Sequence, residues 1–171
     1  SLLEITRVYG TLASGGLEIS PYAVRRVRTG SGAVLYAHVG ARQRLVIAPD
    51  RVGAMSDMLN AALVSGTGRR ALLPRHPAAG KTGTTQEFRD AWFVGYTADF
   101  VGGVWIGNDD NTPMDKVVGG SLPAGMWRQI MTTAHDGVSV KPLPGWDEWD
   151  QPNYASSDRW EEQYWNEGPP P

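Results

Sequence analysis

The sequence predicts an α/β fold in which an antiparallel β-sheet is flanked by helices. Apolar residues recur at helical spacing in three separate stretches, 2–13, 52–63 and 123–134. Strand-like runs rich in apolar residues lie between the second and third stretches, at 78–85, 91–96 and 100–106. A length of 171 residues with 41% hydrophobic content is sufficient for one packed core.

The chain begins with a predicted helix and then a hairpin. Ser1 and Glu4 have the spacing of a capping box, in which each side chain bonds to the backbone of the other residue. The pair Gly15-Gly16 ends this helix. The segments 22–28 and 33–39 flank Thr-Gly-Ser-Gly, which is typical of a β-hairpin turn.

The middle of the chain predicts a second helix and the three strands of the sheet. The second helix begins at Asp50 and ends at Gly66-Thr67-Gly68. The strands 91–96 and 100–106 are joined tightly around Ala98-Asp99. Both of these strands carry apolar residues on both faces, which indicates a central position beneath covering helices.

A third helix closes the predicted body, and a tail of different composition follows. Pro123 is suited to a first helical position, and Gly137 ends the helix. Residues 1–141 contain 15 basic and 11 acidic side chains, whereas residues 142–171 contain one basic and seven acidic side chains. We therefore expect a body over 1–141 and a weakly ordered, acidic, Trp- and Pro-rich tail over 142–171.

Composition excludes several classes of function. The chain has no Cys, so it contains neither a disulfide framework nor a thiolate metal site. No dense basic cluster is present, which argues against nucleic-acid binding. No apolar run approaches the roughly 20 residues of a membrane span, so we expect any membrane anchor to lie in an upstream segment.

The run 81–85, with the sequence Lys-Thr-Gly-Thr-Thr, is the most informative motif. A Lys-Thr-Gly triad is one of three signatures of serine enzymes that react with penicillin. The other two are missing, because no Lys follows a Ser by three residues and no Ser-x-Asn triplet occurs. The motif therefore predicts part of a catalytic domain that lacks its nucleophile.

The context of this triad resembles a known family. The chain is similar to the C-terminal half of the transpeptidase domain of class A (bifunctional) penicillin-binding proteins, over about residues 1–136. Five blocks carry the resemblance, in the order and at the spacing of that family: 2–9, 66–69, 79–85, 89–96 and 103–109. The resemblance implies the fold of a partial penicillin-binding protein or serine β-lactamase-like domain. It also implies a location on the periplasmic face of the bacterial inner membrane.

The resemblance also implies roles for the residues of the triad. Lys81 and Thr84 would be catalytic, with the Thr84 backbone N–H as one of two oxyanion-hole donors. Thr82, Gly83 and Thr84 would bind substrate at the edge of the sheet. The partners would be peptidoglycan stem peptides and β-lactams, in an acyl transfer that needs no metal and no organic cofactor.

Other residues receive structural interpretations. We expect Thr85 to be a strand-end residue and Arg89-Asp90 a surface turn pair. Trp92, Tyr96 and Trp105 are expected in the sheet core rather than in a substrate platform. His38, His76 and His135 lie apart in the sequence and predict no metal site or relay, and the acidic loop over 107–120 lacks the spacing of an EF-hand.

Three alternatives to a transpeptidase fragment stay open. A serine β-lactamase would share the Lys-Thr-Gly triad, although the 89–107 block fits it poorly. A non-catalytic penicillin-binding-like domain would keep the same strand as scaffold. The chain can also be a standalone module without an upstream catalytic segment. Acylation by penicillin and the reading frame upstream of Ser1 separate these alternatives.

Overall fold

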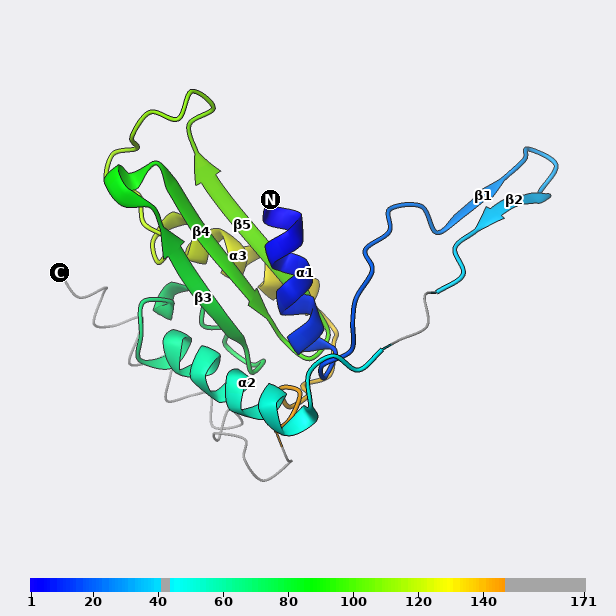
Figure 1. Ribbon diagram of the computed structural model, residues 1–171, viewed down its shortest axis with the longest axis horizontal. Coiled ribbons are helices and arrows are strands. Elements are labelled where there is room, and N and C mark those ends of the chain that lie inside the picture. Colours follow the sequence, from blue (N-terminus) through cyan, green and yellow to red (C-terminus); the bar gives the residue numbers. More distant parts are fainter. Residues whose placement is uncertain (41–43, 147–171) are drawn as a thin grey trace.

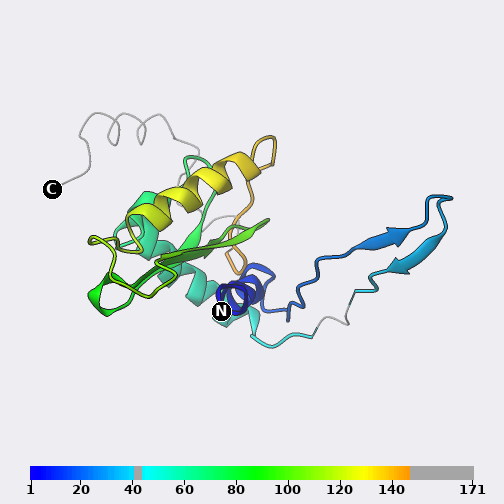
Figure 2. The ribbon, with the colours of Figure 1, turned by 90° about the horizontal axis from the view of Figure 1, so that it is seen from above.

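A three-stranded antiparallel sheet lies between helices that cover its two faces (Figures 1 and 2). The computed structural model describes residues 1–40 and 44–146 of the chain. The sheet has the order β3-β4-β5, and its strands are β3 (Ala79–Thr84), β4 (Asp90–Tyr96) and β5 (Val101–Gly107). The helices around it are α1 (Leu2–Ala13), α2 (Pro49–Val64) and α3 (Leu122–Ala134). This arrangement confirms the predicted fold class.

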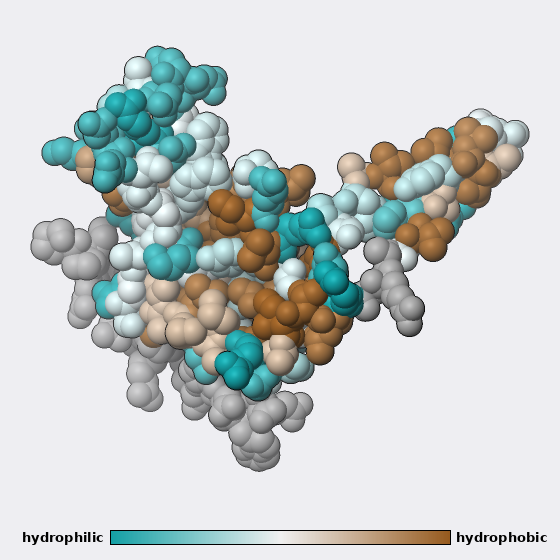
Figure 3. Space-filling view, viewed as in Figure 1, coloured by the Kyte–Doolittle hydropathy of each residue, from teal (hydrophilic) through white to brown (hydrophobic). Residues whose placement is uncertain are grey.

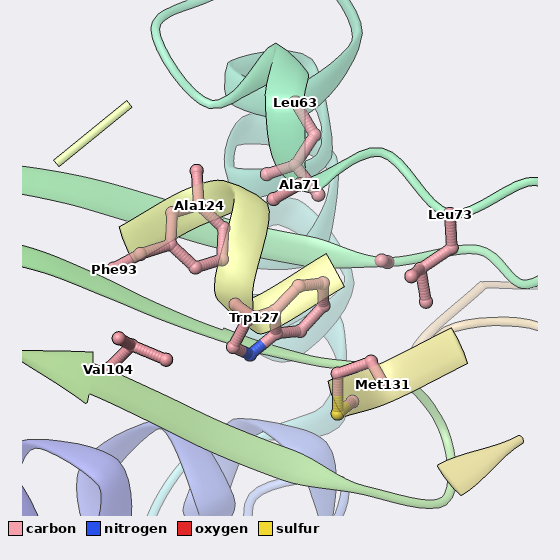
Figure 4. Close-up of a cluster of buried hydrophobic side chains, with 9 residues drawn as sticks. Leu63, Ala71, Leu73, Phe93, Val104, Ala124, Trp127 and Met131 are labelled. Carbon is pink, nitrogen blue, oxygen red and sulfur yellow. The ribbon is translucent and has the colours of Figure 1, made fainter. Parts of the chain in front are cut away.

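The two faces of the sheet are packed by different helices. Phe93 of β4 lies on one face, where it is fully buried against Trp127 of α3 with ring centroids 5.1 Å apart. Figure 4 shows this cluster, which also takes in Leu63 of α2 and Val104 of β5. The Trp127 indole N–H donates to the carbonyl of Gly102 in β5 at 3.1 Å, so the buried polar group of this aromatic anchor is satisfied.

Tyr96 anchors the opposite face of the sheet. Its side chain is fully buried in a cluster with Leu12 of α1, Leu59 of α2 and Leu143. The Tyr96 hydroxyl is hydrogen-bonded to the hydroxyl of Ser56 at 3.0 Å, and burial raises the pKa of Tyr96 to about 12. Leu143 is also buried, so the packed part of the chain continues past residue 141; residues 147–171 of the expected tail lie outside the described residues.

The helix boundaries follow local sequence signals closely. The capping box of α1 is present as predicted, with the Ser1 hydroxyl accepting from the Glu4 backbone N–H. The helix ends before Gly15 and Gly16, which both adopt positive φ angles that favour glycine. α2 begins one residue before the predicted Asp50, because Pro49 occupies the first helical turn.

The expectation of two central strands is only half correct. β4 pairs with a strand on each side, whereas β5 pairs only with β4 among the described residues. The apolar residues of β5 are covered from its two faces by α1 and α3, which explains the pattern without a second neighbouring strand. β3 forms the other edge of the described sheet.

The predicted hairpin forms but is shorter than expected. Its strands are β1 (Arg26–Arg28) and β2 (Val34–Ala37), with a register shift between Val27 and Arg28. The hairpin projects away from the body, and apolar side chains are exposed along it (Figures 1 and 3). The pairing shortens because an isolated two-stranded ribbon has no buried face to hold its ends together.

The histidines are less isolated in space than in sequence. His76 and His135 lie with ring centroids 4.3 Å apart, which corrects the expectation that they are separate. His135 is buried and hydrogen-bonded to the Thr97 hydroxyl at 2.9 Å. His38 stacks on Tyr22 at 3.8 Å in the hairpin. None of these pairs belongs to a group of three or more candidate metal ligands in the described part of the chain.

The helices of the described residues are all too short or too polar to cross a membrane.

The Trp127 anchor leads to a stability prediction. Trp127→Ala removes the largest buried side chain of its cluster, so we expect a loss of about 3–5 kcal/mol in the free energy of unfolding. Met126→Ala is the matched control on the same helix, because Met126 is 41% exposed, and we expect a change of about 0.5 kcal/mol. Urea denaturation followed by far-UV circular dichroism measures both. Equal losses in the two variants would show that α3 does not pack as described.

Candidate active site on the edge strand

The Lys-Thr-Gly run forms most of edge strand β3. Lys81 and Thr84 are exposed, while Thr82 and Gly83 are half-buried. The strand continues from a buried start at Ala79, which anchors it in the core. The structure therefore brings all four predicted site residues together on one exposed stretch of backbone.

The pairing with β4 determines which backbone groups of β3 are free. The Thr85 N–H donates to the Asp90 carbonyl at 3.0 Å, and the register pairs Gly83 with Trp92 and Thr84 with Ala91. In an antiparallel ladder, hydrogen-bonded and non-hydrogen-bonded pairs alternate. Thr84 therefore belongs to a non-hydrogen-bonded pair, and its N–H and C=O point away from β4 toward the open edge. The same holds for Thr82, two residues earlier.

Lys81 brings a positive charge to this open edge. Its ammonium group donates to the carbonyl of Thr82 at 3.0 Å and approaches the Thr82 hydroxyl oxygen at 3.4 Å. Within residues 1–40 and 44–146, no carboxylate lies within ion-pair distance of Lys81. An uncompensated cation beside hydroxyls and free backbone amides is suited to an anionic, extended ligand.

A residue outside the strand also belongs to the site. The hydroxyl of Thr67, in the turn after α2, is hydrogen-bonded to the Thr82 hydroxyl at 2.7 Å. The sequence predicted only a helix-ending turn here, and the turn does end α2, with the Gly68 N–H donating to the Ala62 carbonyl at 2.8 Å. No periodic pattern in the sequence signals a contact across 15 residues, so this contact of Thr67 could not be predicted from the sequence.

The end of the polar loop 107–120 packs over the same strand. The Gly119 N–H donates to the Thr84 hydroxyl oxygen at 3.0 Å. A Cβ on Gly119 would lie 2.2 Å from the Trp92 carbonyl oxygen and 2.6 Å from that of Gly83. A Cβ on Gly120 would lie 2.2 Å from the Thr67 carbonyl oxygen. Only glycine allows this close approach, and the sequence carries no local signal for it at Gly119 and Gly120.

The neighbouring polar residues close the turn between β3 and β4. The Asp90 N–H donates to the Thr85 hydroxyl oxygen at 2.8 Å, which agrees with the interpretation of Thr85 as a strand-end residue. Arg89 bonds to the Glu87 carboxylate and to the Asn111 carbonyl, while Asp90 accepts from the Trp105 indole N–H at 2.8 Å. These contacts are structural ones, as expected for a surface turn.

The expectation that three aromatic residues lie in the sheet core is correct only in part. Tyr96 is fully buried, but Trp92 is half-buried and Trp105 is 39% exposed. The two Trp rings lie with centroids 6.2 Å apart on the face of the sheet that Gly83 shares. The reason is that this end of the sheet extends past the helices that cover its centre in the described residues.

The chain is similar in fold to a solved penicillin-binding protein and to a solved D,D-transpeptidase domain. The chain superposes on the penicillin-binding protein PonA1 from Mycobacterium tuberculosis with a TM-score of 0.72 and 28% identity, covering 84% of this chain and 40% of that one. The D,D-transpeptidase domain of a peptidoglycan glycosyltransferase from Eggerthella lenta gives a TM-score of 0.67 and 25% identity, covering 80% of this chain and 32% of that one. The fold is thus that of a penicillin-binding protein.

The sequence comparison gives the family directly. Residues 1–132 match the penicillin binding protein transpeptidase domain, and the chain belongs to this family. It is 38% identical to penicillin-binding protein 1A of Aquifex aeolicus over 123 residues, which is 71% of this chain and 17% of that relative. The chain therefore spans less than a fifth of the length of that relative. The resemblance stated from the sequence is confirmed.

The surroundings of Gly119 and Gly125 predict opposite effects of a Gly→Ala substitution on stability. Gly119→Ala forces a Cβ into the backbone of β3 and β4, so we expect a loss of about 1–3 kcal/mol in the free energy of unfolding. Gly125→Ala is the control, because a Cβ there meets nothing within 4 Å and the residue lies inside α3. We expect it to stabilise the chain by about 0.5–1 kcal/mol. Thermal denaturation of both variants checks the signs, and a neutral Gly119→Ala would contradict the packing.

Proposed function

We propose that this chain is the C-terminal part of the catalytic domain of a peptidoglycan D,D-transpeptidase, with β3 as one wall of the active site. One observation carries the proposal: the Thr84 N–H points to an open strand edge beside the Lys81 ammonium group and two threonine hydroxyls. Membership of the transpeptidase family supports it. Because the chain contains no Ser-x-x-Lys sequence, the proposal places the nucleophile on another segment of the natural protein.

The reaction is acyl transfer between two stem peptides. The serine hydroxyl attacks the carbonyl between two terminal D-alanines, and its proton passes to the leaving amine as D-alanine departs. The Thr84 N–H and the N–H of the serine stabilise the oxyanion that forms on the carbonyl. Losing one such donor typically lowers the rate by about 10²–10³-fold. An amine from a second stem peptide then takes the acyl group, and the serine is regenerated.

The substrate binds alongside β3 as an added strand. Backbone groups at the open edge, among them the N–H of Thr84, pair with its backbone, and Gly83 leaves room for close approach. Its terminal carboxylate lies between Lys81 and the hydroxyls of Thr82 and Thr84. The Thr84 oxygen already accepts from Gly119, so its proton is available to the carboxylate. β-Lactams present a similar carboxylate and are trapped by the same serine.

The natural protein that contains this chain acts at the outer face of the bacterial inner membrane, where peptidoglycan is assembled. We propose that an upstream segment anchors it there and carries the nucleophile. Residues 1–141 then form the C-terminal part of the transpeptidase domain, Leu143 packs against its core, and the sequence over 142–171 is acidic in composition.

The proposal predicts penicillin acylation that depends on Lys81. In the full-length natural protein, we expect Lys81→Ala to lower the rate of acylation by about 100-fold or more, because the cation that stabilises the site is lost. Lys116→Ala is the matched control, since Lys116 is exposed and has no ion pair among the described residues. Intact mass after timed incubation with penicillin measures both.

Three outcomes would contradict the proposal in distinguishable ways. An adduct on the 171-residue chain alone would show that the chain supplies its own nucleophile. No adduct on the folded full-length protein would favour a non-catalytic penicillin-binding-like domain. An adduct that hydrolyses rapidly would favour a serine β-lactamase over a transpeptidase.

A further inference from the structure

The hydroxyl of Thr67 has a position that a helix-ending turn does not require. Thr67 is exposed, and two of its groups contact residues of the site. Its hydroxyl lies 2.7 Å from the Thr82 hydroxyl. Its carbonyl oxygen lies against Gly120, so closely that a Cβ on Gly120 would clash with it. The main-chain bond that closes the turn is made by Gly68 rather than by Thr67. The Thr67 hydroxyl is therefore not needed to end α2.

The hydrogen-bonding capacity of the Thr82 hydroxyl indicates which partner donates in its hydrogen bond with Thr67. A hydroxyl has one proton to donate and two lone pairs that accept. The Lys81 ammonium group lies 3.4 Å from the Thr82 oxygen and can act only as a donor. If the Thr67 hydroxyl also donates to this oxygen, both lone pairs are occupied. The Thr82 proton is then left for a group at the open edge of β3.

We propose that Thr67 is a positioning residue that orients the Thr82 hydroxyl toward the substrate carboxylate, an inference that rests on the proposed function. Without an anion, the hydroxyl pair can donate in either direction. A bound carboxylate selects one direction, because hydrogen bonds to a charged acceptor are about twice as strong as neutral ones. Thr67 thereby increases the preference of the site for a carboxylate over an uncharged group.

The surrounding backbone holds Thr67 in place for this role. Gly119 donates to Thr84, and the adjacent Gly120 packs on the Thr67 carbonyl oxygen, where a Cβ would lie at 2.2 Å. The segment Gly119-Gly120 therefore contacts the Thr84 hydroxyl directly and supports the Thr82 hydroxyl indirectly, through Thr67. The exposed Thr67 side chain makes little contribution to the core, so its hydroxyl can be removed without loss of the fold.

The test compares a penicillin that carries its carboxylate with one that does not. The second-order rate constant of acylation is measured for benzylpenicillin and for its methyl ester, on the full-length natural protein. We expect Thr67→Val to lower the rate with benzylpenicillin about tenfold and the rate with the ester by less than about twofold. Thr67→Ser keeps the hydroxyl, so both rates should stay within about twofold of the wild type.

Controls separate positioning from a general structural effect. Thr133→Val removes a hydroxyl whose hydrogen bond in the described part of the chain lies within α3, and it should change neither rate. Equal losses for the two penicillins in Thr67→Val, or a failure of Thr67→Ser to retain activity, would overturn the inference. If the wild-type protein is not acylated by either compound, the proposed function fails first, and this inference fails with it.

Discussion

The register between β3 and β4 is the constraint on which the candidate site depends. Phe93 and Tyr96 lie on opposite faces of β4, and each is fully buried in a separate core. A one-residue slip of β4 would move both side chains to the wrong face, so their burial fixes the position of β4. A one-residue slip of β3 against β4 would instead turn the Thr84 N–H from the open edge toward β4. The position of β4 and the register of β3 on it therefore determine which backbone amides are available to a ligand.

The site is assembled from three segments that converge on one edge strand. β3 supplies the Lys81 cation, the hydroxyls of Thr82 and Thr84, and the backbone amides at the open edge. The turn after α2 contributes Thr67, and the end of the polar loop contributes Gly119. Each of these contacts one threonine hydroxyl of the strand. These contacts hold the two hydroxyl groups in place on an exposed strand edge.

The sequence was sufficient to predict those helices and strands whose boundaries are set by neighbouring residues. The capping box of Ser1, the glycines after α1 and the apolar runs of the strands all lie within a few residues of what they determine. The family motif placed Lys81 to Thr84 on a strand at the sheet edge. The contacts of Thr67 and Gly119 could not be predicted, because they join residues 15 and 35 positions apart without any periodic pattern. The His76–His135 pair was missed for the same reason.

The most direct test of a catalytic role for this strand edge is the structure of the full-length natural protein after acylation by penicillin. The free Thr84 N–H predicts that the acyl carbonyl oxygen lies about 2.7–3.1 Å from the Thr84 nitrogen. The bound penicillin carboxylate should then contact the hydroxyls of Thr82 and Thr84. An acyl carbonyl oxygen held by other donors, with β3 not in contact with the adduct, would contradict the assignment of this strand to the active site.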